Sequence, residues 1–323
     1  MTIWEQRKQW QFLRKSVQSG QVSHAYLFAG PRGLGKKEVA LEFARLLNCQ
    51  ARDFEQRPCG HCLSCQEIAK KTHPDLFLID GLGEAEEAEI NLIRDVGRWL
   101  SLKPGLGKFR VLIIDQFQGL SLPAQSALLK TLEEPRGEAV LILISDYPEL
   151  LTSTILSRLQ GIRFYPWPRP EMIDLLISRG AVASLAERIY RLSFGRPTRA
   201  LQLLEPEQLK KAEEKIERLA ARLGHDLPGW FREIETLVKE NDDLNTDLAL
   251  WLDTLRLIFL VKLGAIQKES LAATERKLLS SAAEIPLFRI KDFLFSLAET
   301  NYLLSRTNTN PRLAIENAVL KLF

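Results

Sequence analysis

The chain of 323 residues has only four cysteines and two methionines, and its net charge is only +3. So small a charge excludes general attraction to a polyanion, and any DNA contact would need a local basic patch. Long hydrophobic runs are lacking too, because Asp253, Arg256 and Lys262 interrupt the apolar stretch 248–266. This spacing predicts an amphipathic helix instead of a membrane span. With no signal-peptide core near Met1, we expect a cytoplasmic protein without a membrane partner.

The first half of the chain alternates short apolar segments with segments of helical periodicity. Strands are expected at 24–29, 76–79, 111–115 and 140–145, and helices at 38–47, 88–100 and 122–134. Strands that alternate with helices are typical of a parallel sheet covered by helices. The predicted fold class is therefore α/β.

The pattern changes after residue 164. A proline-dense connection at 165–170 is followed by helical periodicity without a convincing strand. We therefore predict three domains: an α/β domain at 1–164, a small helical domain at 165–205 and an all-helical domain at 206–323. Oligomer contacts are expected through the last of these.

Gly30, Gly33, Gly35 and Lys36 match the glycine-rich pattern of a phosphate-binding loop. The pattern lies between a predicted strand and a predicted helix. In this context backbone N–H groups at the helix N-terminus bind phosphates, and the lysine adds a positive charge. The sequence therefore predicts a phosphate-loop fold.

Two positions of this loop site depart from a working ATPase. Lys37 stands where a Ser or Thr hydroxyl holds Mg²⁺, and an ammonium group has only donors. Asp115 matches the acid that holds the metal, but Gln116 follows where a water-activating Glu is expected. We therefore expect no efficient hydrolysis, and the sequence leaves open whether ATP or ADP binds. The alternative is that Lys37 points to solvent and Mg²⁺ is held otherwise.

All cysteines lie within residues 49–65, as Cys49, Cys59, Cys62 and Cys65. Clustered cysteines in a cytosolic chain indicate a metal site. Four thiolates with two short spacings suit tetrahedral Zn²⁺ in a closed, structural site. Iron–sulfur ligation is the competing interpretation, and redox cycling a weaker one.

Several motifs together resemble the bacterial clamp-loader subunits of DNA polymerase III, which are of the AAA+ class. They are the loop at 24–36, the cysteines, His73-Pro-Asp75, the segments 126–135 and 154–158, and the C-terminal 308–316. The resemblance covers the whole chain. It implies an AAA+ phosphate-loop domain with a zinc module, a helical lid and a helical collar. It also implies gamma/tau motor subunits and delta as partners, with the sliding clamp and primed DNA contacted through the complex.

Within this family the chain is more similar to the stationary, non-hydrolysing branch than to the motors. The resemblance implies that Ser157-Arg158 projects into the ATP site of a neighbouring motor, where Arg158 acts in trans as an arginine finger. Thr198 stands at the family's sensor-2 arginine, with Arg199 one residue further, so the role of Arg199 stays open. Alternatively, Arg158 is an ordinary surface arginine at a helix end.

Two other functions compete with this one. A working ATPase motor of the same family requires Lys37 to be tolerated. A solitary zinc-containing nucleic-acid-binding protein would use Arg52, Arg57, Lys70 and Lys71, but these lack the interleaved aromatic residues that stack on bases.

Overall fold

The computed structural model describes residues 7–80, 86–133, 137–223, 226–240, 244–266, 273–304 and 309–323. The chain forms two compact units, Met1–Leu201 and Gln202–Phe323. The finer division at residues 164 and 205 stays a prediction. Parts of the motifs at 126–135 and 308–316 lie outside the described residues.

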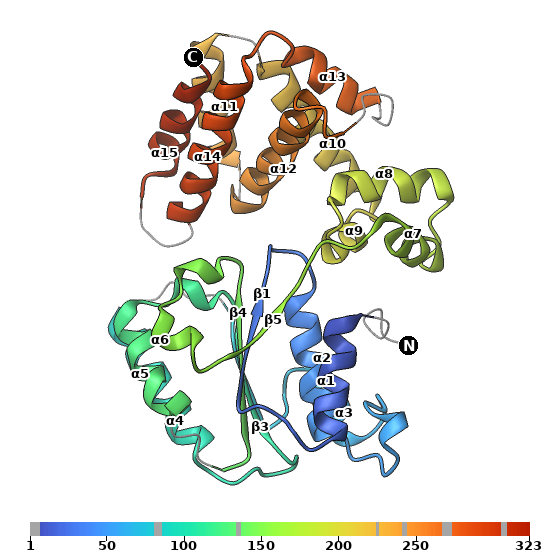
Figure 1. Cartoon of the computed structure of the whole chain (residues 1–323), viewed down its shortest axis with the longest axis vertical. Helices are drawn as coiled ribbons and strands as arrows, with labels where there is room; N and C mark the ends of the chain where they lie inside the picture. Colours follow the sequence, from blue (N-terminus) through green and yellow to red (C-terminus); the bar gives the residue numbers. More distant parts are fainter. Residues whose placement is uncertain are drawn as a thin grey trace. The chain divides into compact units, whose positions relative to one another are not determined.

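The first unit is built on a parallel sheet (Figure 1). Its strands are β1 (Ala25–Ala29), β2 (Leu76–Ile79), β3 (Arg110–Ile114), β4 (Ala139–Ser145) and β5 (Gln160–Arg163). They pair in the order β2-β3-β4-β1-β5, and all four pairs are parallel. The residues of β1, β3 and β4 are all buried, as expected where helices cover both faces of a parallel sheet.

Helices flank the sheet on both sides (Figure 1). On one side lie α1 (Lys8–Gln18), α2 (Lys36–Asn48) and α3 (Leu63–Ala69), and on the other α4 (Glu86–Leu100), α5 (Leu122–Glu133) and α6 (Ser153–Leu156). Short 3₁₀ turns occur at Phe54–Gln56, Phe117–Gly119 and Pro148–Leu150. The parallel α/β fold class predicted from the sequence is confirmed.

Alternating side chains of β1 serve the two faces of the sheet. Ala25, Leu27 and Ala29 belong to the core shared with α4 and α5. On the opposite face, the ring of Tyr26 meets that of Phe43 from α2 edge-on, with centroids 5.4 Å apart. Because side chains on both faces of β1 are packed, the strand cannot shift along its neighbours. The loop that follows β1 is therefore held at the carboxyl edge of the sheet.

A small group of helices follows β5: α7 (Arg169–Ser178), α8 (Ala183–Ser193) and α9 (Pro197–Gln202). The turn before α9 packs against the preceding proline-rich segment at Gly195. This glycine has a φ of +71°, and a Cβ there would lie 2.9 Å from Pro166 Cβ and from Trp167 O. Trp167 N–H also donates to Gly195 O at 2.7 Å. Only glycine fits at position 195. Its contact with Pro166 and Trp167 therefore fixes the position of Arg196 and of the start of α9.

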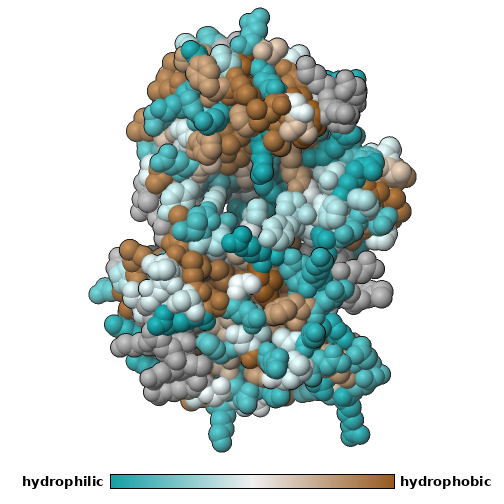
Figure 2. Space-filling view, in the orientation of Figure 1, coloured by the Kyte–Doolittle hydropathy of each residue, from teal (hydrophilic) through white to brown (hydrophobic). Residues whose placement is uncertain are grey.

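The second unit is helical. It contains α10 (Pro206–Arg222), α11 (Leu227–Glu240), α12 (Leu244–Lys262), α13 (Ala273–Ser281), α14 (Leu287–Leu304), α15 (Pro311–Val319) and a last 3₁₀ turn, Leu320–Leu322. Its core holds Trp230, whose ring packs edge-on against Trp251 and Phe293. Hydrophobic residues also gather on the surface of these helices, as Figure 2 shows. Among the described residues, no helix has the length and apolarity of a membrane span.

Candidate functional site

The glycine-rich loop lies between the end of β1 and the start of α2, as the sequence predicts. Gly33 and Gly35 have φ angles of +83° and +81°, which favour glycine. Gly30 is confined by its neighbours, because a Cβ there would lie 2.5 Å from Phe164 O. The glycines therefore give the loop a shape that side chains would prevent. Its role in nucleotide binding stays a prediction.

Lys36 is turned into the loop that precedes it. Its Nζ donates to Gly30 O at 2.5 Å, to Pro31 O at 2.8 Å and to Asp146 Oδ1 at 2.7 Å. The side chain is only 4% exposed. An ammonium group has three N–H donors, so the three acceptors use all of them.

Lys37 also points inward, onto two carboxylates. Its Nζ lies 2.6 Å from Asp80 Oδ1 and 3.7 Å from Asp115 Oδ2. Asp80 follows β2 and Asp115 follows β3, so the ammonium group joins the carboxyl ends of two neighbouring strands. The Lys37 ammonium group is therefore paired with carboxylates, although its side chain is 28% exposed, and whether Mg²⁺ is held otherwise stays an open alternative. Asp115 is the predicted metal-holding acid, and in this structure its charge partner is a lysine.

Gln116 and Asp115 form the remaining part of the predicted site. Gln116 has a left-handed φ of +54°, and its N–H donates to Asp115 Oδ1 at 3.0 Å. Burial raises the pKa of Asp115, the Lys37 ammonium opposes this change, and Asp146 and Asp80 add to it. An amide at 116 has no basic group that could take a proton from water. The site brings lysine and aspartate side chains into contact, but residue 116 supplies no general base.

Sequence reasoning missed two acids and one arginine at this edge. Asp80 and Asp146 belong to no motif, but each directly follows a parallel strand. Arg196 lies beside the loop: its side-chain carbons are 3.4–3.9 Å from the place of a Cβ on Gly33. Thr198 N–H donates to Gly33 O at 3.2 Å. Arg199 is the residue that the family comparison places one position beyond sensor 2. Its Cζ lies 6.0 Å from the ring centroid of Phe194.

Ser157 and Arg158 lie between α6 and β5. Arg158 Nη1 donates to Thr154 O at 2.8 Å and to Ser157 Oγ at 3.3 Å. Ser157 is exposed and Arg158 is partly exposed. The pair precedes the amino end of β5, whereas the phosphate loop follows the carboxyl end of β1, and these two strands are parallel neighbours. The structure therefore does not bring Arg158 to the loop of its own chain.

The four cysteines come together next to α2 and α3. Their sulfur atoms all lie within 4.8 Å of one another, and none forms a disulfide. Cys49 follows the last residue of α2, and Cys62 precedes α3. Cys59 N–H donates to Cys49 Sγ at 3.3 Å, and Cys62 N–H donates to Cys59 Sγ at 3.4 Å.

The chemistry of this cluster fits a metal ion. Burial raises the pKa of Cys49 and Cys65. Burial also acts to raise that of Cys59, but hydrogen bonds from backbone N–H groups, including those of Cys62 and His61, bring it down to about 6. Adjacent thiolates repel one another, and a bound divalent cation removes this repulsion. Four thiolates at this spacing could hold Zn²⁺ through Cys49, Cys59, Cys62 and Cys65.

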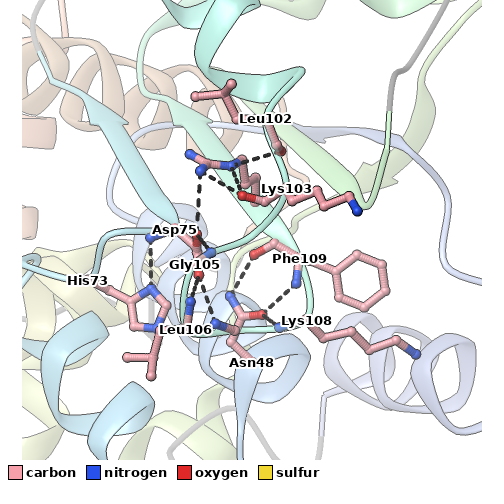
Figure 3. A network of polar contacts seen from close by, with 11 residues as sticks. Asn48, His73, Asp75, Leu102, Lys103, Gly105, Leu106, Lys108 and Phe109 are labelled. Carbon is pink, nitrogen blue, oxygen red and sulfur yellow. Dashed lines mark hydrogen bonds and ion pairs between the residues drawn. The ribbon is translucent and has the colours of Figure 1, made fainter.

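A polar network connects this module to the sheet (Figure 3). The carboxylate of Asp75 accepts from the N–H groups of Gly105, Leu106 and Gly107 at 2.7–2.8 Å. Asn48, the last residue of α2, accepts from the N–H groups of Lys108 and Phe109. The two side chains fix the loop between α4 and β3. His73-Pro-Asp75 is one of the motifs of the family resemblance, but the sequence alone does not predict this role of Asp75.

Replacement of Asp75 by asparagine is expected to destabilise the first unit by about 2 kcal/mol at neutral pH, because the amide NH₂ cannot accept backbone N–H groups. Burial acts to raise the pKa of Asp75, but the three N–H groups and His73 lower it below the ordinary value. Its stabilising contribution is therefore present above about pH 4 and is lost as the pH falls through the folded pKa.

Urea unfolding of the wild type and Asp75→Asn across this pH range measures the difference, and hydrogen exchange at residues 105–107 reports it locally. The gap between the two proteins should narrow in acid. A gap that is absent at pH 7, or that does not depend on pH, would contradict the role given to Asp75.

A parallel sheet in this order, with a glycine-rich loop between β1 and α2, is the arrangement of a phosphate-loop α/β domain. The family model described as "DNA polymerase III, delta subunit" matches residues 5–168. This is half of the chain, and the chain therefore belongs to that family of DNA polymerase III clamp-loader subunits.

Individual relatives agree with this assignment. The chain is 41% identical over 142 residues to the delta' subunit of DNA polymerase III from Pseudomonas aeruginosa, which is 43% of this chain and 42% of the relative. It is 31% identical over 220 residues to the Bacillus subtilis delta' subunit, 66% and 64% of the two chains. The B. subtilis tau subunit is 37% identical over 152 residues, 47% of this chain and 26% of tau.

The matched segments span less than two thirds of the length of each of these relatives. Among solved structures, a gamma subunit-related protein of DNA polymerase III from Thermotoga maritima aligns over 98% of both chains, with a TM-score of 0.46 and 21% identity. Both delta' and tau subunits are among the relatives, so these similarities do not assign the chain to either type of subunit.

Proposed function

We propose that this chain is the delta prime type of clamp-loader subunit, a stationary component that does not hydrolyse ATP itself. The observation that carries the proposal is the Lys37 ammonium group, which lies between Asp80 and Asp115. In a motor subunit, the hydroxyl at position 37 and the acid at 115 hold Mg²⁺. Here the side chain of the protein supplies the positive charge in that place.

The substitution removes more than a ligand. Mg²⁺ bridges the β- and γ-phosphate oxygens and neutralises the charge that develops on them, whereas an ammonium group offers no vacant coordination position. A metal ion near Asp115 would also meet the positive charge of Lys37 at short range. Gln116 adds a second defect, because it cannot accept the proton of an attacking water.

In this role the subunit acts on a neighbour. Arg158 is partly exposed, and it precedes the amino end of β5, whereas the loop of its own chain follows the carboxyl end of the neighbouring parallel strand β1. Both features support a finger that enters the ATP site of an adjoining gamma/tau motor subunit. A guanidinium group there stabilises the transferred phosphoryl group and makes hydrolysis depend on subunit contact. The partners in this proposal are gamma/tau and delta, and through the complex the sliding clamp and primed DNA.

The metal of the module belongs to the same proposal. Zn²⁺ held by Cys49, Cys59, Cys62 and Cys65 would be structural, because four protein thiolates leave no open position for a reacting molecule. Its effect would be to tie the end of α2 to α3, next to the loop that Asn48 fixes.

The second candidate is a hydrolysing gamma/tau-like motor, and the 37% identity to a tau subunit over 152 residues favours it. The purified chain alone separates the two. We expect no magnesium-dependent release of phosphate from ATP above the rate of a Lys36→Ala control, which lacks the lysine of the phosphate loop. Magnesium-dependent turnover by the wild type on the order of 0.01 s⁻¹ or faster, a rate known for isolated phosphate-loop proteins with a finger in cis, would favour the motor.

A further inference from the structure

The outer face of α1 carries two lysines with an aromatic ring between them. Lys8, Phe12 and Lys15 are all exposed, Phe12 to 42%. Because a helix turns by about 100° per residue, the three side chains lie within about 60° of one another, and the lysines are about 10 Å apart along the axis. We call these three residues the α1 stripe. The opposite face of the helix, with Trp10 and Leu13, is buried.

The charge of this helix is of one sign. Residues 7–20 contain four cations and no acid, and Glu5, three residues before Lys8, lies outside the described part of the chain. The two arginines pair with acids from other segments: Arg7 with Glu171, and Arg14 with Glu55. For Lys8 and Lys15, the described residues supply neither an ion pair nor a side-chain hydrogen bond. The α1 stripe is therefore a local basic patch on a chain whose net charge is only +3.

Contacts at both ends hold α1 in one orientation. At its N-terminal end, the Arg7 guanidinium lies over Trp167, 4.2 Å from the ring centroid. At its C-terminal end, Arg14 Nη1 donates to Arg57 O at 2.6 Å, and Arg14 Cζ lies 5.1 Å from the ring centroid of Phe54. The last two contacts tie the helix to the segment that carries the cysteines. The α1 stripe is thus presented to solvent by a fixed helix, which lowers the entropy cost of binding.

The chemistry of the α1 stripe fits a polyanion with flat, stackable groups. Ammonium groups bind phosphates, and an exposed aromatic ring between them can stack on a base. A single strand exposes the faces of its bases, whereas a duplex hides them, so the ring of Phe12 favours a single strand. A membrane surface does not fit, because the apolar face of α1 that would insert is buried in the fold. An acidic peptide would satisfy the lysines but would have no use for the ring.

We propose that the α1 stripe binds single-stranded DNA, with phosphates on Lys8 and Lys15 and a base stacked on Phe12. The chain belongs to a family of DNA polymerase III subunits, which supports DNA over RNA. The inference goes beyond the proposed function, in which DNA is reached through the complex. It does not depend on whether this subunit hydrolyses ATP. The contact is weak and independent of sequence, because every base has a face that can stack on one ring.

Fluorescence anisotropy of a labelled oligothymidylate of about 16 nucleotides, titrated with the full-length chain, tests the inference. We expect a dissociation constant on the order of 1–100 µM at about 50 mM salt. The logarithm of the binding constant should fall with the logarithm of the salt concentration with a slope of about −1.4, the value for two phosphate contacts on a single strand.

Two sets of variants separate stacking from charge. Phe12→Leu keeps the apolar surface but loses the ring, so affinity should fall roughly fivefold to a hundredfold with an unchanged salt slope, and Phe12→Tyr should restore it. Lys8→Gln combined with Lys15→Gln should lower affinity and flatten the slope. The matched control, Lys70→Gln with Lys71→Gln, removes the same charge at two exposed lysines after α3 and should leave both quantities nearly unchanged.

The substituted side chains are exposed, so all variants should melt at the temperature of the wild type. Absence of saturable binding by the wild type would overturn the inference. So would an equal loss of affinity in the Lys70/Lys71 control, because binding would then follow net charge alone. Poly-glutamate that competes as well as DNA, with no effect of Phe12→Leu, would assign the α1 stripe to an acidic peptide instead. Tighter binding of oligouridylate would assign it to RNA.

These outcomes are distinct from failure of the proposed function. A chain that releases no phosphate from ATP and does not bind oligothymidylate keeps the stationary role and loses only the site on α1. A chain that turns over ATP but binds oligothymidylate through the α1 stripe keeps the site and loses the stationary role.

Discussion

Replacement of Cys62 by serine is expected to lower the thermal unfolding midpoint of the N-terminal unit by roughly 10 °C, with loss of bound zinc. Structural zinc contributes apparent free energies of about 10–16 kcal/mol in small domains, and loss of one of four thiolates forfeits several kcal/mol. In a unit of this size, each 1 kcal/mol corresponds to about 2–4 °C. Calorimetry and metal analysis of the full-length chain measure both quantities.

The position of the cysteines explains why the effect should extend beyond the module. Cys49 directly follows Asn48, and Asn48 holds the loop that leads into β3. A module that loosens at Cys49 therefore loosens the end of α2 and one support of a central strand. Hydrogen exchange in residues 103–109 should rise in Cys62→Ser, even though the substitution lies far away in the sequence.

A matched control distinguishes ligation from a general effect of substitution in the module. His61 lies next to Cys62, is exposed, and contacts only Cys59 O through Nδ1 among the hydrogen bonds described for its side chain. His61→Ala should keep both the zinc and the melting temperature. The structural metal site would be refuted if the wild type held no zinc and Cys62→Ser had the same unfolding midpoint as the wild type. Visible absorbance with bound iron would support the iron–sulfur alternative.

The strands that could be predicted from sequence are short apolar runs: β1, β3 and β4, which are buried throughout, and the partly buried edge strand β2. The expected segment 111–115 is shifted by one residue from β3, and the expected segment 140–145 begins one residue later than β4. The fifth strand, β5, was missed, because Gln160–Arg163 is short, polar and at the sheet edge, with only Ile162 buried. Such a strand has no hydrophobic pattern, and its pairing to β1 alone defines it.

The site divides in the same way. The glycines, Lys36, Lys37 and Asp115 follow a spacing set by the loop and could be found from sequence. Asp80 and Asp146 have no such spacing, although each comes directly after a parallel strand. Because parallel strands end at one edge of the sheet, an acid after every such strand is a signal that sequence reasoning could have used. Partner choice among these charges, however, depends on side-chain geometry that no spacing encodes.

The lid segment shows a second limit. The sequence directed attention to Arg199, because it lies one residue beyond the family's sensor-2 position. In the structure Pro197 opens α9, and Arg196, the residue before it, lies against Gly33. Where a helix begins decides which side chain faces the loop, and a shift of one residue changes that face by about 100°.

Replacement of Arg158 by alanine is expected to leave folding intact but to depress ATP turnover of the reconstituted clamp loader. Arg158 is partly exposed, and its described hydrogen bonds go to Thr154 O and Ser157 Oγ, within four residues of it in the chain. At the adjoining motor site an arginine finger is worth roughly 10³-fold or more in rate. The measurement is DNA-stimulated phosphate release by this chain assembled with a motor subunit and delta, with the melting temperature as a check on folding.

Two further variants show whether the guanidinium group itself acts at the motor site. Arg158→Lys keeps the charge but loses the planar pair of donors, so turnover should stay well below that of the wild type. Arg98→Ala, at an exposed arginine of α4 whose ion pair among the described residues is with Asp95, should leave turnover unchanged. If Arg158→Ala assembles normally and the complex keeps full turnover, Arg158 is an ordinary surface arginine. If turnover falls because the complex does not assemble, the residue serves an interface; only assembly without turnover identifies a finger that acts on the phosphoryl group.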